Sequence, residues 1–197
     1  MNNCQSKENS SSLLTDRFLK AFEFAFRLHK NQLRKGSNIT YLSHLMAVAA
    51  LVSEDGGDEE EVIAAILHDT VEDHGGYKTL FEIRETFGER VANIVEACSD
   101  SFTLPKPPWE KRKRDYILHL KNASPGARRV SLADKIHNAR SILRDLDCIG
   151  ETVWERFNGG KRGTVWYYQS LSQIFTLEQD GYMAIEFKRL VSQISER

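Results

Sequence analysis

The sequence has little cysteine and no long apolar run. Its three cysteines, Cys4, Cys98 and Cys148, are odd in number, far apart and not arranged as a CxxC pair. This pattern predicts free, mostly buried thiols in a reducing compartment and excludes a disulfide framework. No stretch approaches the ~18 apolar residues of a membrane span, and the polar first dozen residues lack the apolar centre of a signal peptide. We therefore expect a cytoplasmic protein with no membrane partner.

The chain also lacks an excess of charge of either sign. Lys plus Arg number 27 against 28 Asp plus Glu, for a net charge of -1. Such a balance provides no field that would favour DNA or RNA, so neither is an expected partner. An anionic ligand would have to meet a local basic cluster. The 197 residues, 41% of them apolar, suffice for one domain with a substantial core.

Apolar residues recur at steps of three and four almost throughout, and no period-two run is long enough for a strand. The predicted fold class is all-α, a single bundle of about eight to ten helices. Residues 1–12 are Ser/Asn-rich and expected to be a disordered tail. Glycine and proline clusters separate the helices, which we expect at about 14–29, 41–54, 58–74, 78–86, 89–100, 107–122, 126–146, 160–177 and 180–195.

Four ionisable side chains lie close together at the end of one apolar helical run. His68 and Glu72 are four residues apart, and so are Asp69 and Asp73. On a continuous helix these pairs form two neighbouring stripes of one surface. Three carboxylates beside an imidazole repel one another unless a cation lies among them. The segment therefore predicts a metal site with additional acid/base groups.

Two further ligand candidates lie in other apolar helical segments. They are His44, within 41–48, and Asp134, within 130–138, where an unpaired charge would be costly. Two histidines and two aspartates form a mixed nitrogen/oxygen set that suits Mn²⁺, Fe, Zn²⁺ or Mg²⁺, in declining order of preference. Each of these candidates also has a simpler explanation. His44 could be a hydrogen-bonded core histidine, Asp134 a helix-surface or capping residue, and Asp69 and Glu72 the charged end of an ordinary helix.

Several blocks of the sequence resemble a known family. The order of His44, His68-Asp69 and Asp134 resembles the H…HD…D pattern of the HD-domain metallohydrolases. Four longer blocks resemble the small alarmone hydrolases, which are related to the hydrolase half of bacterial (p)ppGpp synthetase/hydrolases; these blocks are HxxQxRK at 29–35, LHDxxED at 67–73, FGxxVxxIV at 87–95 and LADKxHN at 132–138. The chain departs from the usual pattern at Thr40 and Leu45, where the family has prolines, and at His74.

The resemblance implies a metal-dependent phosphohydrolase domain over 13–197 that removes the 3′-pyrophosphate of (p)ppGpp, giving GDP or GTP and pyrophosphate. It further implies that Mn²⁺ is held by His44, His68, Asp69 and Asp134. Glu72 and Asp73 would be the catalytic residues, which orient a water and move its proton. Two alternatives remain: an HD-type phosphohydrolase of another nucleotide, for example of the 2′-phosphate of NADPH, and a nucleotide-binding sensor without turnover.

The nucleotide substrate requires cations and hydrogen-bonding groups. By resemblance, Arg34 would stack on the base and Lys35 would approach a phosphate. The other substrate-binding candidates are Asn138, on the same helix face as Asp134, and Lys161, Arg162 and Tyr168 near the start of an aromatic helix. The basic run 111–114 fits either a pyrophosphate contact or a solvated face. We expect a hydrophobic core that includes Phe22, Phe26, Trp154, Trp166 and Tyr167; the oligomeric state stays open.

Overall fold

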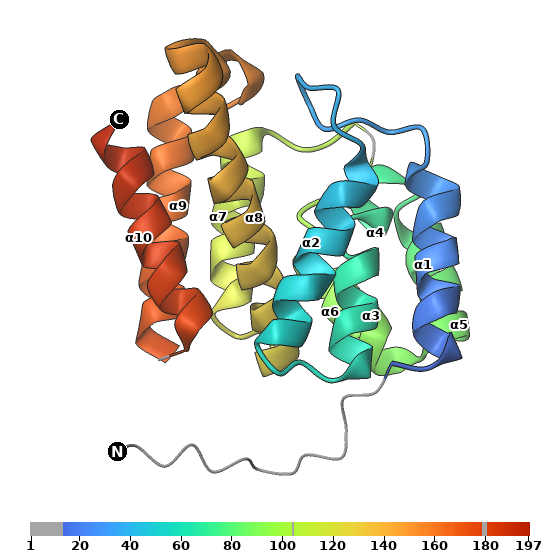
Figure 1. Ribbon diagram of the computed structural model, residues 1–197. Helices are drawn as coiled ribbons and strands as arrows, with labels where there is room; N and C mark the ends of the chain where they lie inside the picture. The colour runs from blue at the N-terminus through green and yellow to red at the C-terminus, as the bar shows by residue number, and fades with distance from the viewer. Residues whose placement is uncertain (1–13, 104, 179–180) are drawn as a thin grey trace.

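The computed structural model describes residues 14–103, 105–178 and 181–197, and in these ranges the fold is all-α, as predicted (Figure 1). The expected disordered tail, 1–12, lies outside them. The described chain contains one isolated β-bridge, Leu33 to Thr40, and no strand. No helix of the described ranges is both long and apolar enough to span a membrane.

The elements are α1 Asp16–His29, α2 Tyr41–Glu54, α3 Glu59–Leu67, α4 Thr70–Asp73, α5 Tyr77–Phe87, α6 Glu89–Cys98, α7 Trp109–Leu120, α8 Pro125–Ile149, the 3-10 helix η1 Gly150–Arg156, α9 Gly160–Glu178 and α10 Tyr182–Glu196.

Several helices begin where the sequence provides a capping side chain. Thr15, Asp58 and Ser124 accept hydrogen bonds from backbone amides in the first turns of α1, α3 and α8. Pro125 occupies the start of α8, where its missing N–H costs nothing. These local signals explain why the predicted starts agree with the observed ones.

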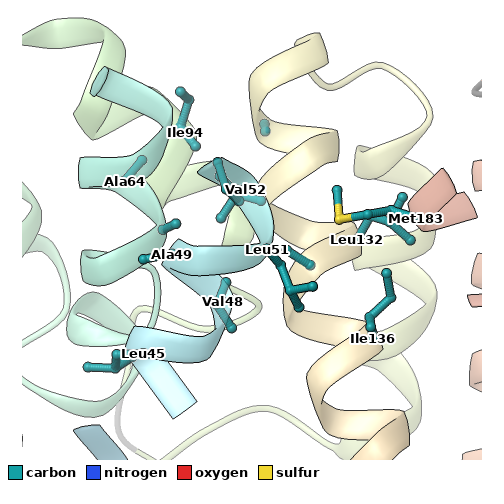
Figure 2. Packing of buried hydrophobic residues seen from close by; sticks show 14 of the residues in the cluster. Leu45, Val48, Ala49, Leu51, Val52, Ala64, Ile94, Leu132, Ile136 and Met183 are labelled. Carbon is teal, nitrogen blue, oxygen red and sulfur yellow. The ribbon is translucent and has the colours of Figure 1, made fainter. Parts of the chain in front are cut away.

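The long helix α8 lies at the centre of the bundle. It packs against α2, α3 and α6 on one side and against α10 on the other, while α9 packs on α10 and α1 on α3 (Figure 1). Apolar side chains of α2, including Leu51 and Val52, lie between Ile94 of α6 and Leu132 of α8 (Figure 2). Because α2, α3 and α8 are packed through apolar faces, polar side chains on those faces are forced together inside the protein.

The helix predicted to run through 58–74 is in fact broken. α3 ends at Leu67, and α4 begins at Thr70 after a two-residue turn. The His68 ring bonds the carbonyl of Ala65 at 2.8 Å, and the Thr70 hydroxyl donates to the carbonyl of Leu67 at 2.6 Å. Such side-chain bonds compete with the helical ladder. His68 and Asp69 consequently lie at a helix junction, and the prediction of two stripes on one continuous helix was wrong.

Two other sequence expectations need correction. Phe26, expected in the core, is 48% exposed because it lies on the outer face of α1. Cys98 and Cys148 are free thiols as expected, but Cys148 is exposed near the end of α8. Cys4 lies outside the described residues. Trp154 and Tyr167 are buried as predicted.

A buried carboxylate connects three helices below the site. Glu61 of α3 is 5% exposed and pairs with Arg90 of α6, at 3.0 Å, and with Arg129 of α8. A Cβ added to Gly126 of α8 would lie 2.7 Å from Glu61 Oε1, so α3 and α8 approach closely here. Glu61 therefore fixes the spacing of helices that carry the site residues.

We expect Glu61→Ala to lower the free energy of unfolding by about 2 to 3 kcal/mol, because it removes the shared partner of two cations in a largely buried position. Urea unfolding measures the change. The matched control is Glu110→Ala, since Glu110 forms an exposed pair with Arg114 and should change stability by less than about 0.5 kcal/mol. Equal effects of the two substitutions would contradict a structural role for Glu61.

Candidate metal centre

Two buried imidazoles face each other where α2 meets the α3–α4 junction. His44, from α2, is fully buried and His68 is 2% exposed; their ring centroids are 5.1 Å apart. The Nδ1 atom of His44 lies 2.7 Å from Nδ1 of His137, and the Nδ1 atom of His68 bonds the Ala65 carbonyl. A histidine that donates from Nδ1 has its Nε2 lone pair free to bind a metal.

The Nε2 atoms meet the carboxylates at short range. Asp134 Oδ1 lies 3.2 Å from Nε2 of His44 and 3.7 Å from Nε2 of His68. Asp69 Oδ2 lies 3.4 Å and 3.0 Å from the same two atoms. Both Nε2 atoms are buried, and neither has a hydrogen-bond partner among the described residues. Ligand atoms of His44, His68 and Asp134 all lie within 4.8 Å of one another.

This arrangement fits a divalent metal. Two unpartnered imidazole nitrogens and an anionic oxygen that converge at a buried point are a donor set for a borderline or hard cation. His44, His68 and Asp134 form the divalent metal site that the sequence predicted. Asp69, the fourth predicted ligand, presents an oxygen to the same two nitrogens, and that oxygen also accepts a 2.7 Å hydrogen bond from the Tyr41 hydroxyl.

The carboxylates of Asp69 and Asp134 favour positive charge between the two histidines. Burial by itself would lower the pKa of His68, but the carboxylates of Asp69 and Asp134 outweigh burial and raise the pKa to about 10. Burial by itself would raise the pKa of Asp134, yet Lys135 and the imidazoles hold that pKa well below its usual value. Asp134 therefore stays anionic in spite of its burial.

Neighbouring side chains orient Asp134. Lys135 Nζ and Asn138 Nδ2 each donate to it at 2.5 Å, and Arg34 donates to Asn138 Oδ1 at 2.5 Å. The Arg34 guanidinium also lies 5.6 Å from the centre of the Tyr41 ring. This chain of contacts connects the loop after α1 to the metal-binding face of α8, and it fixes which carboxylate oxygen points at the histidines.

The two predicted catalytic carboxylates share one cation, since Lys106 Nζ also lies 3.8 Å from Asp73 Oδ1, and otherwise have different partners. Glu72 accepts from Lys106 Nζ at 2.8 Å and from the backbone amide of Asp100 at 3.3 Å. Asp73 accepts from Gln32 at 2.8 Å. Burial, together with the negative charges of Asp100 and Asp69, raises the pKa of Glu72 above its usual range, although Lys106 opposes the shift. A carboxylate with a raised pKa is a stronger proton acceptor than an ordinary one.

A cavity of about 370 Å³ opens beside the centre. Of the predicted substrate-binding residues, Arg34, Lys35, Asn138 and Tyr168 line it, as does Glu72. Lys161 and Arg162 do not. The ammonium group of Lys161 is instead bound by Glu151, at 3.0 Å, and by the backbone oxygen of Arg197, which keeps it at the outer surface. The structure therefore gives these two residues no contact with the cavity.

Some cavity residues were missed or left open by the sequence. Arg112 and Lys113 line the cavity, whereas Lys111 and Arg114 form exposed pairs within α7. Tyr167, predicted as core, is buried but also lines the cavity, and its hydroxyl has no hydrogen-bond partner among the described residues; the same is true of Thr164. In the sequence, Thr164 and Tyr167 stand among other aromatic residues of the same helix, Trp166 and Tyr168. Such a pattern looks the same for a helix face in the core and for one that lines a cavity.

Comparisons with known proteins agree with this geometry. The HD domain matches residues 21–164. A guanosine-3′,5′-bis(diphosphate) 3′-pyrophosphohydrolase, MESH1, of Mus musculus is 40% identical over 139 residues, which cover 69% of this chain and 73% of that protein. The MESH1 protein of Homo sapiens is 41% identical over 129 residues, which cover 64% and 69%.

Solved structures are similar as well. The crystal structure of lmo0812 from Listeria monocytogenes EGD-e is 31% identical, with a TM-score of 0.68 over 78% of this chain and 99% of that one. A structure described as a metazoan ortholog of SpoT that hydrolyses ppGpp is 23% identical, with a TM-score of 0.76 over 93% and 98%, and shows the same fold.

We expect a divalent cation such as Mn²⁺ to stabilise the protein, because its ligands come together only when α2, α3 and α8 are packed. At free Mn²⁺ about one hundred times its dissociation constant, the gain is about 2.7 kcal/mol, measured by urea unfolding with and without chelator. Asp134→Asn should lose the gain and the bound metal seen by elemental analysis. Asp115→Asn, at an exposed pair with Lys111, should keep both. Full metal content in Asp134→Asn would contradict the assignment.

Proposed function

Since this chain belongs to the HD-domain family, we propose that it is a metal-dependent 3′-pyrophosphohydrolase of guanosine-3′,5′-bis(diphosphate). The activity named for its relatives agrees with the site. The observation that carries the proposal is the buried His44, His68 and Asp134 cluster beside a cavity whose wall is rich in cations. A substrate that carries several phosphates requires such a wall, and hydrolysis of a phosphate ester benefits from such a metal.

The proposed metal is Mn²⁺, held by His44, His68, Asp69 and Asp134. Two imidazoles with two carboxylates form the mixed donor set that suits this ion. A divalent ion supplies a Lewis acid that attracts phosphate oxygens and lowers the pKa of water. The protein's part is to keep Asp134 anionic through Lys135 and Asn138, and to leave both Nε2 lone pairs directed inward.

Glu72 is the proposed proton acceptor. It lines the cavity and has a raised pKa, and Lys106 and the Asp100 amide fix its orientation. In the reaction, a water oxygen forms a bond to the phosphorus next to the ribose as the bond from that phosphorus to the 3′ oxygen breaks. The water's proton passes to Glu72, the 3′ oxygen is protonated, and GDP and pyrophosphate leave. Asp73, which accepts a hydrogen bond from Gln32, is the proposed proton relay.

The remaining cavity residues support a nucleotide substrate. Arg34, whose guanidinium lies over the Tyr41 ring, could present its planar group to a base, and Lys35 lies next to it in the same loop. Arg112 and Lys113 approach from α7, with Arg112 NH1 3.9 Å from Glu72 Oε1. Positive charge beside the acid/base group would stabilise the pyrophosphate as it leaves. A sensor that only binds nucleotides would need neither Glu72 nor the metal ligands.

A substrate comparison tests the proposal. Protein stripped of metal and reloaded with Mn²⁺ is given ppGpp, NADPH and p-nitrophenyl phosphate in parallel, and the release of pyrophosphate and of phosphate is measured. We expect pyrophosphate and GDP from ppGpp and no comparable turnover of the other two. Turnover of NADPH or of the simple ester alone would show that the substrate is a different one, and binding of ppGpp without any product would favour the sensor.

Glu72→Gln should lower kcat about a hundredfold to ten-thousandfold, because the neutral amide cannot accept the proton. Its metal content and KM should stay close to those of the unmodified protein, since Glu72 is not among the four ligands. Steady-state kinetics with elemental analysis measures both. Glu82→Gln, at an exposed pair with Arg27, is the matched control. If Asp73→Asn loses as much activity as Glu72→Gln, Asp73 takes the proton as well.

A further inference from the structure

A second cluster of charges lines the cavity where α8 ends. Asp145 lies between two arginines: Arg144 donates from Nε and NH2 to its Oδ1, at 3.0 and 2.8 Å, and Arg156 NH1 donates to its Oδ2 at 2.8 Å. All three residues line the cavity. Two guanidiniums that share one carboxylate leave one positive charge uncompensated within this bracket of Arg144, Asp145 and Arg156.

The bracket keeps hydrogen-bond donors as well as charge. A guanidinium carries five N–H donors in a planar fork. Asp145 uses only the NH1 group of Arg156. A carboxylate that holds two arginines in a fixed geometry reduces the entropy lost when they bind an anion. The bracket therefore has the chemistry of a phosphate-binding site.

Arg156 is also fixed from the opposite side. A Cβ added to Gly36 would lie 2.6 Å from Arg156 Cδ, and the backbone of Gly36 has φ +72°. Arg156 therefore packs directly on the loop that carries Arg34 and Lys35. Its side chain is 23% exposed, so η1 and this loop enclose it while it still borders the cavity.

A similar pair of cations lies near the catalytic carboxylate. Asp100, whose side chain is 3% exposed, binds Arg112 and Lys113, and Arg112 also approaches Glu72. Counted alone, this trio carries one net positive charge, and Glu72, which lies 3.9 Å from Arg112, is itself paired with Lys106. The trio comes from α7 and the segment before it, whereas the bracket comes from the end of α8 and from η1. One cavity therefore has two separate, pre-arranged positive centres, and a ligand with two separated anionic groups satisfies both.

We propose that the bracket binds the phosphate group of the nucleotide that is not hydrolysed, the one at the 5′ end, while the trio and the metal centre act at the 3′ end. This inference rests on the proposed function. It makes Arg144 and Arg156 the residues that distinguish a nucleotide with a 5′ phosphate from one without it.

The test compares two substrates in two proteins. One substrate is ppGpp, and the other is guanosine 3′-diphosphate, which has a free 5′ hydroxyl. Arg156→Gln should lower kcat/KM for ppGpp about tenfold, mainly through KM, because a charge-assisted hydrogen bond is lost. The value for guanosine 3′-diphosphate should change less than about twofold. Arg156→Lys, which keeps the charge but not the fork, should recover part of the loss.

A binding measurement separates failure of this inference from failure of the proposed function. Calorimetry with GDP, on the Mn²⁺-loaded protein, needs no turnover. If no protein hydrolyses ppGpp but Arg156→Gln weakens GDP binding about tenfold, the subsite stands and the proposed reaction is wrong. If ppGpp is hydrolysed but Arg156→Gln lowers kcat/KM equally for both substrates, or for neither, the 5′ subsite is overturned.

Two further variants control for structure. Arg189→Gln removes an exposed arginine of α10 that does not line the cavity, and it should leave both substrates unaffected. If Arg156→Gln fails to fold, as judged by thermal unfolding, Arg144→Gln carries the test. The side chain of Arg144 is 50% exposed, so its loss should leave the fold intact and still reduce kcat/KM for ppGpp alone, about threefold.

Discussion

The fold depends on an anionic oxygen that is held inside an apolar bundle. Asp134 lies on the central helix α8, 7% exposed, against two imidazoles from other helices. An isolated carboxylate in this position would be too costly to keep ionised. Lys135 and Asn138 reduce the cost by donating to it from the same helix. The Asp134 carboxylate therefore lies, negatively charged, beside the unpartnered Nε2 atoms of His44 and His68. A divalent cation can bind all three.

The surrounding side chains repeat one arrangement, in which a single carboxylate holds two cations. Glu61 does so for Arg90 and Arg129 within the scaffold, and Asp100 does so for Arg112 and Lys113 at the cavity wall. In the scaffold the arrangement fixes helix spacing. At the cavity it lets long, flexible cations stay in place with a net positive charge, so a phosphorylated ligand finds donors already oriented.

The break between α3 and α4 keeps the proposed acid/base group, Glu72, apart from the metal ligands. His68 and Asp69 lie in the turn and face the centre, while Glu72 lies one short helix further on and is bound by Lys106. A continuous helix would have placed all four groups on one surface. The break gives them different neighbours, and therefore different proton affinities: the pKa of Asp69 is lowered well below its usual value beside His68, whereas burial and Asp100 raise that of Glu72.

The sequence by itself determined the all-α class, most helix boundaries and the meeting of His44, His68 and Asp134, because periodic apolar residues decide which helix faces are buried and polar residues on those faces must converge. It did not show the break at His68, which depends on side-chain bonds to the carbonyls of Ala65 and Leu67. Only the tertiary structure decided which charged side chains line the cavity. Lys161 pairs with Glu151 at the outer surface. Arg156 instead donates to Asp145 beside the cavity and packs on Gly36, which has no side chain to obstruct it. A long charged side chain can reach in many directions, so its place is set by the partner that the fold brings near it.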